Sequence, residues 1–579
     1  MKKQTFLFLV SISLMKGLYS QDNNFIQAYE NMHLQLSFEY PMSSWKAIDW
    51  PQLDALIRPK VIDAAERHDS VGFYIALREY LTYLHDGHVN MRRGWTSIAQ
   101  RAMYRQIGGS YGFATCLTDD GQLAATIVNP GSPADGAGMK FGARLLEINE
   151  QSARQVLDTV SVSWAELIPA TAEGKLLNQC RFIGRAPIGN LLKVKFLNRN
   201  QTNPITATLT AVDDQYETYH QTNMWVVEPG PEVSSAFIPD TPFGYIKLTT
   251  ESSGADSTIT KKIYTDFRDA LQQFKEHDVK GLILDMRINS GGLDALSAAL
   301  AGFFYTEPVL YENLSYYDPE LGSLEIFPIP IPTFDPETLK PRYNPDYPDG
   351  ALFIEPQLLN FSQPVMVMVS PRGVSSGEGL PMALQKLPQC KVVGFHGTHG
   401  SFALVGTLYN VISPPDSLCI LYPFGCSLDK NFQIQLDSDA DFFGGVMPDY
   451  RVPINDTVLD QLYLQHQDVE LKYAIKILNS ILGNVSEMSP GNTGLQLEIA
   501  LPASSDKVLA LRYTLWTTAD IRLEIFDLNG RKIRSIINDR NTAGTHIVYF
   551  DSSGLDSGIY LFTLTDGKSI VSKKWVYQR

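Results

Sequence analysis

Two long apolar runs that end in glycine and serine constrain the fold of this chain more than any other feature. One is GLILDMRINSGG, residues 281–292, and the other is VMVMVSPRGVSSGEG, residues 365–379. Runs this rich in valine, isoleucine and methionine predict central strands of an α/β layer. Because functional residues of such layers gather at the carboxyl ends of the strands, we expect the two turns to face one cleft.

These two turns contain the residue types that acyl transfer requires. Ser375 is expected to project from a tight turn as a nucleophile. Gly291 and Gly292 allow backbone N–H groups to approach an oxyanion without obstruction by a Cβ atom. The alternative is that both segments are strand-to-helix turns that need glycine only for their shape. The occurrence of both motifs in one chain favours the catalytic interpretation.

The length of 579 residues and the hydrophobic fraction of 44% predict several folded domains rather than a disordered chain. The start, MKKQTFLFLVSISLMKGLYSQ, has two lysines before a short apolar stretch, which predicts a signal peptide over residues 1–20. No later segment reaches the ~18 apolar residues of a transmembrane helix. A net charge of −15 argues against nucleic acid as a partner, since phosphate binding needs clustered lysine and arginine.

The cysteines and histidines show no metal-binding pattern. The five cysteines lack CxxC spacing, and an odd number leaves at least one unpaired in an exported protein. Cys419 and Cys426 are close enough in sequence to bridge a short loop, although buried free thiols are an equal alternative. His396 and His399 have no carboxylate or cysteine company, so we expect neither a metal nor a cofactor.

Changes of pattern along the chain predict four folded units after the signal peptide. These are a helical N-terminal unit (21–104), a β-rich domain (105–215), an α/β catalytic core (216–485) and a C-terminal β-sandwich (486–579). The helical unit ends in LHDGHV, where Gly87 is expected to terminate a helix and expose His88 on a turn. Ten prolines between Pro308 and Pro356 predict a long ordered loop or lid over the cleft.

The β-rich domain resembles a PDZ domain. Its segment YGFAT, with Tyr111, Gly112 and Phe113, stands where the loop that binds a peptide carboxylate is expected. The run PGSPADGAGMKFGARLLEIN resembles the turn, short helix and strand that follow. The resemblance implies that an extended peptide, such as the C-terminus of a substrate, adds to the edge of this sheet. A small structural β-domain without a ligand is the alternative.

The C-terminal segment resembles the sorting domain that the type IX secretion system of Bacteroidetes-type bacteria recognises. The resemblance is carried by LEIFDLNGRKIRSI, AGTHIVYFDSSGLDSGIYLFTL and KSIVSKKWVYQR. Together with the signal peptide, it implies export through the periplasm to the cell surface or the medium, with the type IX secretion machinery as a partner. A generic carbohydrate- or protein-binding β-module is the alternative.

Across residues 25–485 the motifs follow the order found in C-terminal-processing (tail-specific) peptidases and the related tricorn core. The matching residues are Leu84, Asp86 and His88; Asp285, Arg287, Asn289, Gly291 and Gly292; Ser375, Ser376 and Glu378; Val393 and Gly394; and Gly445, Val446, Pro448 and Asp449. The resemblance implies an α/β peptidase core of the ClpP/crotonase-like type. It also implies hydrolysis of peptide bonds in unfolded or C-terminal segments of polypeptide substrates.

By this resemblance Ser375 is the nucleophile of a serine peptidase. The backbone N–H groups of Ser376 and of Gly291 or Gly292 then form the oxyanion hole. Asp285, Arg287 and Asn289 are expected to brace the glycine turn rather than to react.

The general base implied by the resemblance is His88. Some members of these families use a lysine after the VG strand, but this chain has no lysine between Lys391 and Lys430. The tricorn-like alternative uses the histidine of the N-terminal motif, and an imidazole pKa of ~6.5 suits a base near neutral pH. A structural histidine at the end of a helix is the other interpretation of His88.

The group that orients the histidine is where this chain departs from the tricorn-like pattern. A glutamate often stands three residues before the glycine of the GV-x-P-D motif, but this chain has Phe442 there. Four carboxylates are candidates for the role by position: Asp86, Asp439, Asp441 and Glu378. Glu378 is also placed to position substrate or Ser376. Loss of an orienting carboxylate lowers the rate by several orders of magnitude, so a weakened enzyme is an alternative.

Two other functions stay open. The segment from Gly373 to Gly377 satisfies the G-x-S-x-G pattern of α/β-hydrolases, an esterase-type fold in which a later histidine is essential. The histidines available for it are His396, His399, His466 and His546. The second alternative is a surface-bound pseudopeptidase that binds peptides without cutting them, and Phe442 favours it.

Overall fold

The computed structural model describes most of the chain. The described residues are 23–92, 95–223, 225, 230–251, 257–334, 340–412 and 418–483, followed by 495–500, 508–515, 519–527, 531–542, 544–555, 558–566 and 570–577. They fall into two compact units, residues 1–482 and residues 483–579. The predicted signal peptide lies outside the described residues, and the division of the first unit into three domains stays a prediction.

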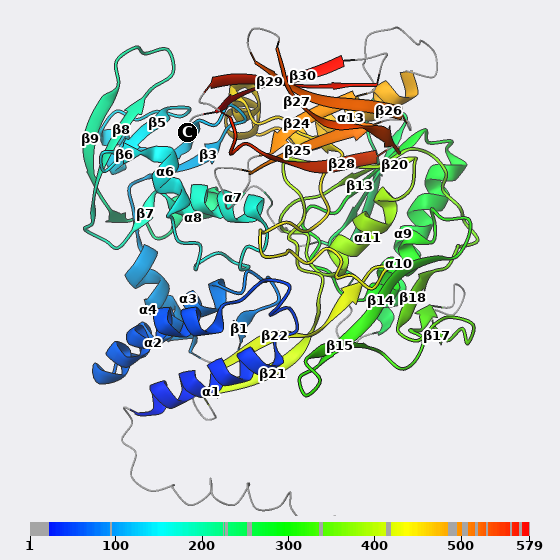
Figure 1. Cartoon of the computed structure of the whole chain (residues 1–579), viewed down its shortest axis with the longest axis horizontal. Coiled ribbons are helices and arrows are strands. Elements are labelled where there is room, and N and C mark those ends of the chain that lie inside the picture. The colour runs from blue at the N-terminus through cyan, green and yellow to red at the C-terminus, as the bar shows by residue number, and fades with distance from the viewer. Residues whose placement is uncertain are drawn as a thin grey trace, which may run out of the picture. The chain divides into compact units, whose positions relative to one another are not determined.

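The first unit contains a six-stranded sheet, of which Figure 1 labels β13 and β20. Its strands, in spatial order, are β11 (Val233–Phe237), β12 (Phe243–Leu248), β13 (Gly281–Asp285), β19 (Val365–Met368), β20 (Cys390–Gly394) and β23 (Tyr450–Arg451). Only β11 is antiparallel to its neighbour, and the other pairs are parallel. The two apolar runs are β13 and β19, and they pair directly, with Asp285 opposite Met368. The prediction of central strands whose ends share one edge is confirmed.

Helices cover both faces of this sheet. The helices are α9 (Ser257–Glu276), α10 (Asp294–Ala301), α11 (Ser376–Gln385), α12 (Asp456–Leu459), a π-helical turn (Asp460–Leu464) and α13 (Val469–Gly483). Leu282 and Leu284 of β13 pack with α9, α10 and α11, while Ile283 packs on the opposite face with α12 and α13. Each fully buried Leu or Ile contributes ~1.5–3 kcal/mol, so this strand is fixed from both sides.

A second sheet is built partly from the proline-rich segment. It contains β1 (Asn90–Arg92), β14 (Val309–Asp318), β15 (Ser323–Ile326), β18 (Ala351–Ile354), β21 (Leu404–Ile412) and β22 (Leu418–Leu428), and a small separate hairpin joins β16 (Thr333–Phe334) to β17 (Pro341–Arg342). The order is β1–β22–β14–β15, with β18 on β14 and β21 on β22. The expectation of an irregular lid over residues 308–356 is therefore wrong, because strand pairing satisfies the backbone polar groups of much of this segment.

The N-terminal unit is helical, as predicted. Its helices are α1 (Asn23–Glu39), α2 (Trp50–Glu66), α3 (Ser70–Thr82) and α4 (Thr96–Ile107), and α1 packs against β21 (Figure 1). The expectation that His88 is exposed after α3 is wrong, since this residue is only 8% exposed. The chain continues directly into β1, which pairs with β22 and draws the histidine into the interior. None of the helices that the structure describes has the length and apolar composition needed to cross a bilayer.

Residues 109–213 form a smaller β-rich region. Its main sheet has β3 (Phe113–Leu117), β4 (Leu123–Val128), β5 (Arg144–Ile148), β8 (Leu191–Leu197) and β9 (Ile205–Thr210) in that order, with β6 (Gln151–Ser152) on β5. A second small sheet joins β2 (Gly109–Ser110), β7 (Arg185–Ala186) and β10 (Val212–Asp213). Four helices accompany them: α5 (Pro133–Gly136), α6 (Ala153–Asp158), α7 (Ala172–Phe182) and α8 (Glu217–Gln221). Thr115 Oγ1 donates to the carbonyl of Cys180 at 3.0 Å, which holds α7 on β3.

The part of the second unit that the structure describes is built from β-strands, as predicted. One sheet contains β24 (Leu495–Ala500), β25 (Val508–Leu515) and β28 (Gly544–Asp551), and the other contains β27 (Lys532–Asn541), β26 (Ala519–Asp527), β29 (Gly558–Thr565) and β30 (Ile570–Tyr577). All strand pairs are antiparallel, and apolar residues of both sheets share one core.

All five cysteines are free. Cys419 and Cys426 both lie on β22. Seven residues of extended strand separate their Cα atoms by ~23 Å, so the alternative of a disulfide between them is wrong.

Candidate active site

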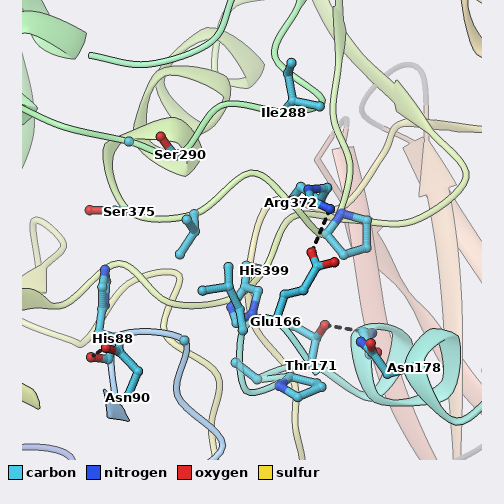
Figure 2. A pocket seen from close by; sticks show the side chains of 18 of the residues that line it. His88, Asn90, Glu166, Thr171, Asn178, Ile288, Ser290, Arg372, Ser375 and His399 are labelled. Carbon is cyan, nitrogen blue, oxygen red and sulfur yellow. Dashed lines mark hydrogen bonds and ion pairs between the residues drawn. The ribbon is translucent and has the colours of Figure 1, made fainter. Parts of the chain in front are cut away.

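One cavity of about 660 Å³ lies at the carboxyl ends of β13 and β19 (Figure 2). The residues that line it come from segments far apart in sequence and include Gly87, His88, Glu166, Arg181, Ser290, Gly291, Gly292, Arg372, Ser375 and His399. The predicted nucleophile, the predicted base and the two predicted glycines therefore border the same space.

Ser375 stands on a strained turn between β19 and α11. Its backbone has φ 60° and ψ −138°, a region that residues other than glycine rarely adopt. The turn is held by hydrogen bonds from the Ser375 N–H to the carbonyl of Ser401 (2.8 Å) and from the Glu378 N–H to the carbonyl of Ser375 (2.7 Å). Its hydroxyl makes no hydrogen bond with the described residues, whereas Ser376 is fully buried and donates to Asp294 Oδ1 at 2.6 Å. Of the two serines, Ser375 is the one available to a substrate.

The backbone of Gly291 touches the serine turn. Its φ is 79°, and a Cβ atom placed there would lie 2.6 Å from the carbonyl oxygen of Val374 and 2.7 Å from Ser375 Cβ. Since real Cβ atoms do not approach other atoms so closely, the two turns meet only because this residue is glycine.

Two of the three N–H groups expected in the oxyanion hole are available. The N–H of Gly291 is already used, because it donates to Asn289 Oδ1 at 2.8 Å. The N–H groups of Gly292 and Ser376 make no hydrogen bond within the described part of the chain. Asn289 is fully buried and also donates to Glu251 Oε1 at 3.0 Å, so it braces the turn from behind.

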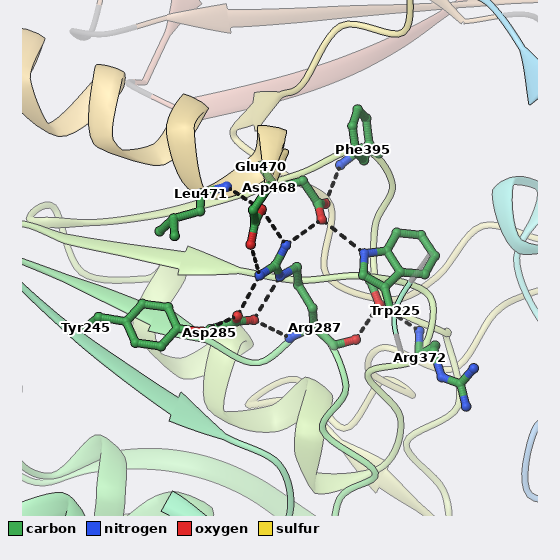
Figure 3. A network of polar contacts seen from close by, with 10 residues as sticks. Trp225, Tyr245, Asp285, Arg287, Arg372, Phe395, Asp468, Glu470 and Leu471 are labelled. Atoms are coloured by element: carbon green, nitrogen blue, oxygen red, sulfur yellow. Dashed lines mark hydrogen bonds and ion pairs between the residues drawn. The ribbon is translucent and has the colours of Figure 1, made fainter. Parts of the chain in front are cut away.

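Arg287 is not among the residues that line the cavity, and its ion pairs hold parts of the core together (Figure 3). Arg287 pairs with Asp285 at 2.7 Å, with Asp468 at 2.8 Å and with Glu470 at 3.0 Å. Glu470 also accepts hydrogen bonds from Trp225 Nε1 (3.0 Å) and from the Phe395 N–H (3.2 Å). This network joins the end of β13 to the start of α13.

His88 enters the cavity from the turn after α3, and in Figure 2 its ring points towards the side on which Ser375 lies. Asp86 Oδ1 accepts the backbone N–H of His88 at 2.8 Å and lies 3.8 Å from His88 Nδ1. Burial lowers the pKa of His88 below 6.5, although Asp86 opposes this, so the imidazole is neutral at pH 7. No hydrogen bond joins His88 to Ser375 within the described residues, and contacts of this kind often tighten only when substrate binds.

A buried amine and a second carboxylate surround Asp86. Tyr40 donates its hydroxyl to Asp86 Oδ2 at 2.8 Å. Lys46 is 2% exposed, and its Nζ donates to the carbonyls of His85 (3.0 Å) and Ser438 (2.9 Å). Burial lowers the pKa of Lys46, while Asp86 and Asp437 counteract this shift. No motif predicted these groups, because they come from positions almost 400 residues apart.

The acidic residues near Phe442 do not reach the cavity. Asp439 Oδ1 accepts the N–H groups of Asp441 (2.9 Å) and Phe443 (3.0 Å) within its own turn, and Asp441 is exposed. Phe442 itself stacks on His85, with ring centroids 4.3 Å apart. Of the four candidate carboxylates, Asp86 is the one near His88 Nδ1.

Glu378 holds the loop between β20 and β21 (residues 395–403), which we call the histidine loop. It is fully buried and accepts hydrogen bonds from the Thr398 hydroxyl and from the N–H groups of Gly400 (2.8 Å) and Ser401 (2.7 Å). Burial raises the pKa of Glu378 to about 7. His399 of the same loop lines the cavity, and burial, assisted by His88, lowers its pKa to about 4.

The remaining histidines lie elsewhere. His396 Nδ1 is 4.0 Å from Glu173, His466 lines a different cavity, and His546 lies in the second unit. An α/β-hydrolase mechanism needs one of these four later histidines beside the serine. Within the described residues, only His399 lines the cavity of Ser375.

The residues predicted to bind a peptide carboxylate are turned inwards. Tyr111 and Phe113 are buried, and none of the three predicted residues is among those that line the serine cavity. The N–H of Tyr111 donates to the carbonyl of Gly184 (2.9 Å), and that of Gly112 donates to Ser110 Oγ (2.9 Å). A peptide carboxylate therefore has to replace these internal acceptors to bind here.

Comparison with known families agrees with this site. Residues 242–452, which include Ser375 and both glycines, match the sequence profile of peptidase family S41. The chain carries a family S41 peptidase domain. It is thus a serine-type peptidase, and His88 is supplied from outside the matched residues. Residues 502–578 match the secretion system C-terminal sorting domain, which confirms the sorting segment and implies export to the cell surface or the medium.

Two solved structures, both of mature CPAF, share the fold of this chain at low sequence identity. Mature CPAF is 14% identical and aligns over 81% of this chain and 99% of its own, with a TM-score of 0.51. Mature CPAF complexed with lactacystin is 14% identical and aligns over 80% of this chain and 98% of its own, with a TM-score of 0.50. The photosystem II D1 C-terminal processing protease is 16% identical and aligns over 80% of this chain and 98% of its own, with a TM-score of 0.34. Comparison with curated proteins found no match.

Three arginines (Arg92, Arg181 and Arg372) and Glu166 also border the cavity, and no sequence motif predicted them. Arg372 stands on the serine turn itself, whereas Glu166 and Arg181 come from before and within α7. Of these charged residues, only Arg372 could have been placed near the cavity from sequence, because it stands three residues before Ser375.

Proposed function

We propose that this peptidase is an exported serine endopeptidase that cuts unfolded or C-terminal segments of polypeptides through an acyl-enzyme on Ser375. The observation that carries the proposal is one cavity bordered by a glycine turn, a neutral histidine and Ser375, which stands on a strained turn and whose hydroxyl has no hydrogen-bond partner among the described residues. These are the components that acyl transfer to serine requires.

The proposed reaction uses the groups of the cavity in two half-reactions. His88 takes the proton of Ser375 Oγ as that oxygen attacks the scissile carbonyl. The N–H groups of Gly292 and Ser376 donate to the oxyanion, and each such donor is worth ~2.7–4 kcal/mol in the transition state. The protonated His88 then gives its proton to the leaving amine. In the second half-reaction His88 takes a proton from water, which attacks the acyl-enzyme, and returns it to Ser375 Oγ as that oxygen leaves.

Asp86 is the proposed orienting group. It fixes the backbone of His88 through one hydrogen bond, and its charge, 3.8 Å from Nδ1, stabilises the imidazolium that forms during the reaction. A shift of less than 1 Å brings Nδ1–H within hydrogen-bond distance. In this proposal Asp86 replaces the glutamate whose position Phe442 occupies.

The finer structural assignments belong to the same proposal. The core (216–485) is of the ClpP/crotonase-like type, and residues 105–215 are a PDZ-like domain that presents an extended substrate segment to the cavity. The order of strands and the contact of α7 with both β3 and the serine cavity support this arrangement. Residues 1–20 are the signal peptide, and the sorting domain directs type IX export from the periplasm.

A catalytically weak, peptide-binding protein is the second candidate. Phe442 in place of an acidic residue favours it, as does His88 Nδ1, which has no hydrogen-bond partner among the described residues. A fluorophosphonate probe discriminates, because a folded protein that does not label at Ser375 fits this candidate only.

The decisive experiment is proteolysis of an unfolded protein substrate by the chain without its first 20 residues. Ser375→Ala, His88→Ala and His399→Ala variants are compared with the parent after matching their thermal unfolding. Loss of activity with Ser375→Ala and His88→Ala, and its retention with His399→Ala, supports the proposal. Loss with Ser375→Ala and His399→Ala alone assigns the base to His399, and an inactive parent favours the binding protein.

A further inference from the structure

The cavity of Ser375 is cationic, although the chain as a whole has a net charge of −15. The charged side chains among the described residues that line it are those of Arg92, Arg181, Arg372 and Glu166. Burial lowers the pKa of both lining histidines, so neither adds or removes charge at neutral pH. Three guanidinium groups therefore face one carboxylate.

Arg181 and Arg372, here called the arginine pair, both lie beside Glu166, and Figure 2 shows the contact of Glu166 with Arg372. Glu166 Oε2 lies 2.8 Å from Arg372 Nη1, but Oε1 lies 3.7 Å from Arg181 Nη2, which is too far for a hydrogen bond. Arg181 Nη2 is buried and has no hydrogen-bond partner within the described residues. A buried, unsatisfied donor on a cation is costly, so one carboxylate leaves this pair incompletely bound.

Neighbouring residues hold both guanidinium groups in place. Arg181 donates from Nε to Thr222 Oγ1 (2.9 Å) and from Nη1 to Asn178 Oδ1 (3.1 Å). Arg372 Nη1 donates to Asn223 Oδ1 at 3.0 Å. The side chain of Glu166 is 44% exposed, against 12% for Arg181 and 30% for Arg372. Glu166 is thus the member of the cluster that can move away most easily.

We infer that the arginine pair binds a carboxylate of the substrate, either an Asp or Glu side chain or a C-terminal carboxylate, close to the scissile bond. The inference rests on the proposed function and names its substrate class. Planar guanidinium groups match carboxylates in geometry and charge. Glu166 occupies the anion position when no substrate is bound, and the substrate carboxylate displaces it.

The distance along the chain limits where the substrate carboxylate can lie. Arg372 precedes Ser375 by three residues, so their Cα atoms are at most ~11 Å apart. An extended substrate covers the same distance in about three residues. Because the arginine side chain adds several ångströms to this reach, the acidic group belongs within about five residues of the bond that is cut.

Binding to the Ser375→Ala variant tests the inference without requiring cleavage. The probes are fluorescent peptides in which one position is Asp, Asn or Lys, each with a free or an amidated C-terminus. We expect Asp over Asn, or acid over amide, to bind roughly 10- to 100-fold more tightly at one position. The two comparisons distinguish a side-chain carboxylate from a terminal one.

Three added substitutions separate charge recognition from structural damage. Arg372→Gln should abolish the carboxylate preference while neutral peptides still bind. Glu166→Gln should have the opposite effect and strengthen binding of the preferred acidic peptide, because it removes the internal competitor. Arg92→Gln is the matched control, since it removes the same charge from the cavity wall outside the pair and should keep the preference.

The outcomes of the binding and cleavage experiments are independent. Equal binding of acidic and neutral peptides, or a preference that survives Arg372→Gln, overturns the inference and leaves the proposed peptidase reaction standing. If the parent protein cuts no substrate but binds acidic peptides preferentially, and this preference depends on Arg372, the proposed reaction is refuted and the inference is supported.

Discussion

Replacing Asp86 with asparagine tests the proposed mechanism most directly. Asn has the same shape and keeps an oxygen for the His88 N–H, but it removes the charge 3.8 Å from Nδ1. At an effective dielectric constant of ~20, two opposite unit charges at this distance attract by about 4 kcal/mol. The charge on His88 exists only while it holds the proton of Ser375, so the attraction is lost from the transition state. Since ~1.4 kcal/mol is a factor of ten in rate, kcat should fall by about 10³-fold.

The pH dependence of kcat/KM gives a second readout of the same substitution. Burial lowers the pKa of His88, and Asp86 counteracts that shift. Removing the Asp86 charge therefore lowers the pKa of His88 further, because protonation becomes less favourable. Activity requires the neutral imidazole, so the acid limb of the profile should move to lower pH in Asp86→Asn.

Tyr40→Phe is the matched control for these measurements. It removes the other hydrogen bond to Asp86 but leaves the charge in place. Both variants disturb the buried surroundings of Lys46, so thermal unfolding is measured beside the kinetics. A kcat for Asp86→Asn within about threefold of the parent, together with an unmoved acid limb, refutes the assignment of Asp86.

Three further substitutions test the surroundings of the serine. Gly291→Ala puts a methyl group 2.7 Å from Ser375 Cβ and should lower fluorophosphonate labelling at least about tenfold, whereas Gly322→Ala, with a similar φ of 69° but nothing within 4 Å, should label normally. Glu378→Gln leaves a backbone N–H of the histidine loop without an acceptor and should lower the unfolding free energy by about 1–3 kcal/mol, so an unchanged urea midpoint contradicts that anchoring role. Burial raises the pKa of Glu251 to about 8, so the stability from its protonated form is complete below its ordinary value of 4.5 and is lost as pH rises through about 8. Glu251→Gln should lose less stability than the parent between about pH 4.5 and 8, and parallel pH curves for the two proteins argue against a protonated Glu251.

Local patterns predicted the central architecture because local forces dominate there. The run from Gly281 to Asp285 is apolar on both faces, and only a central strand buries such a run completely. The positions of Ser375 and of the glycine turn followed from the same reasoning, since both stand where strands end. The match to a secretion system sorting domain likewise follows from motifs contained in one continuous segment.

Long-range contacts escaped prediction because sequence spacing does not encode them. The prolines by themselves predict an irregular segment, but pairing with strands elsewhere in the chain, such as β22, makes part of it regular. The burial of His88 likewise depends on the pairing of β1 with β22.

The sequence alone determined that this chain has an α/β core with a serine and a glycine turn at one edge, because strand burial and turn chemistry depend on neighbouring residues. Only the tertiary structure decided which carboxylate lies near His88 and that Asn289 occupies the N–H of Gly291. It alone brought Arg181, Arg372 and Glu166 together, since packing of distant segments sets the distances between charges.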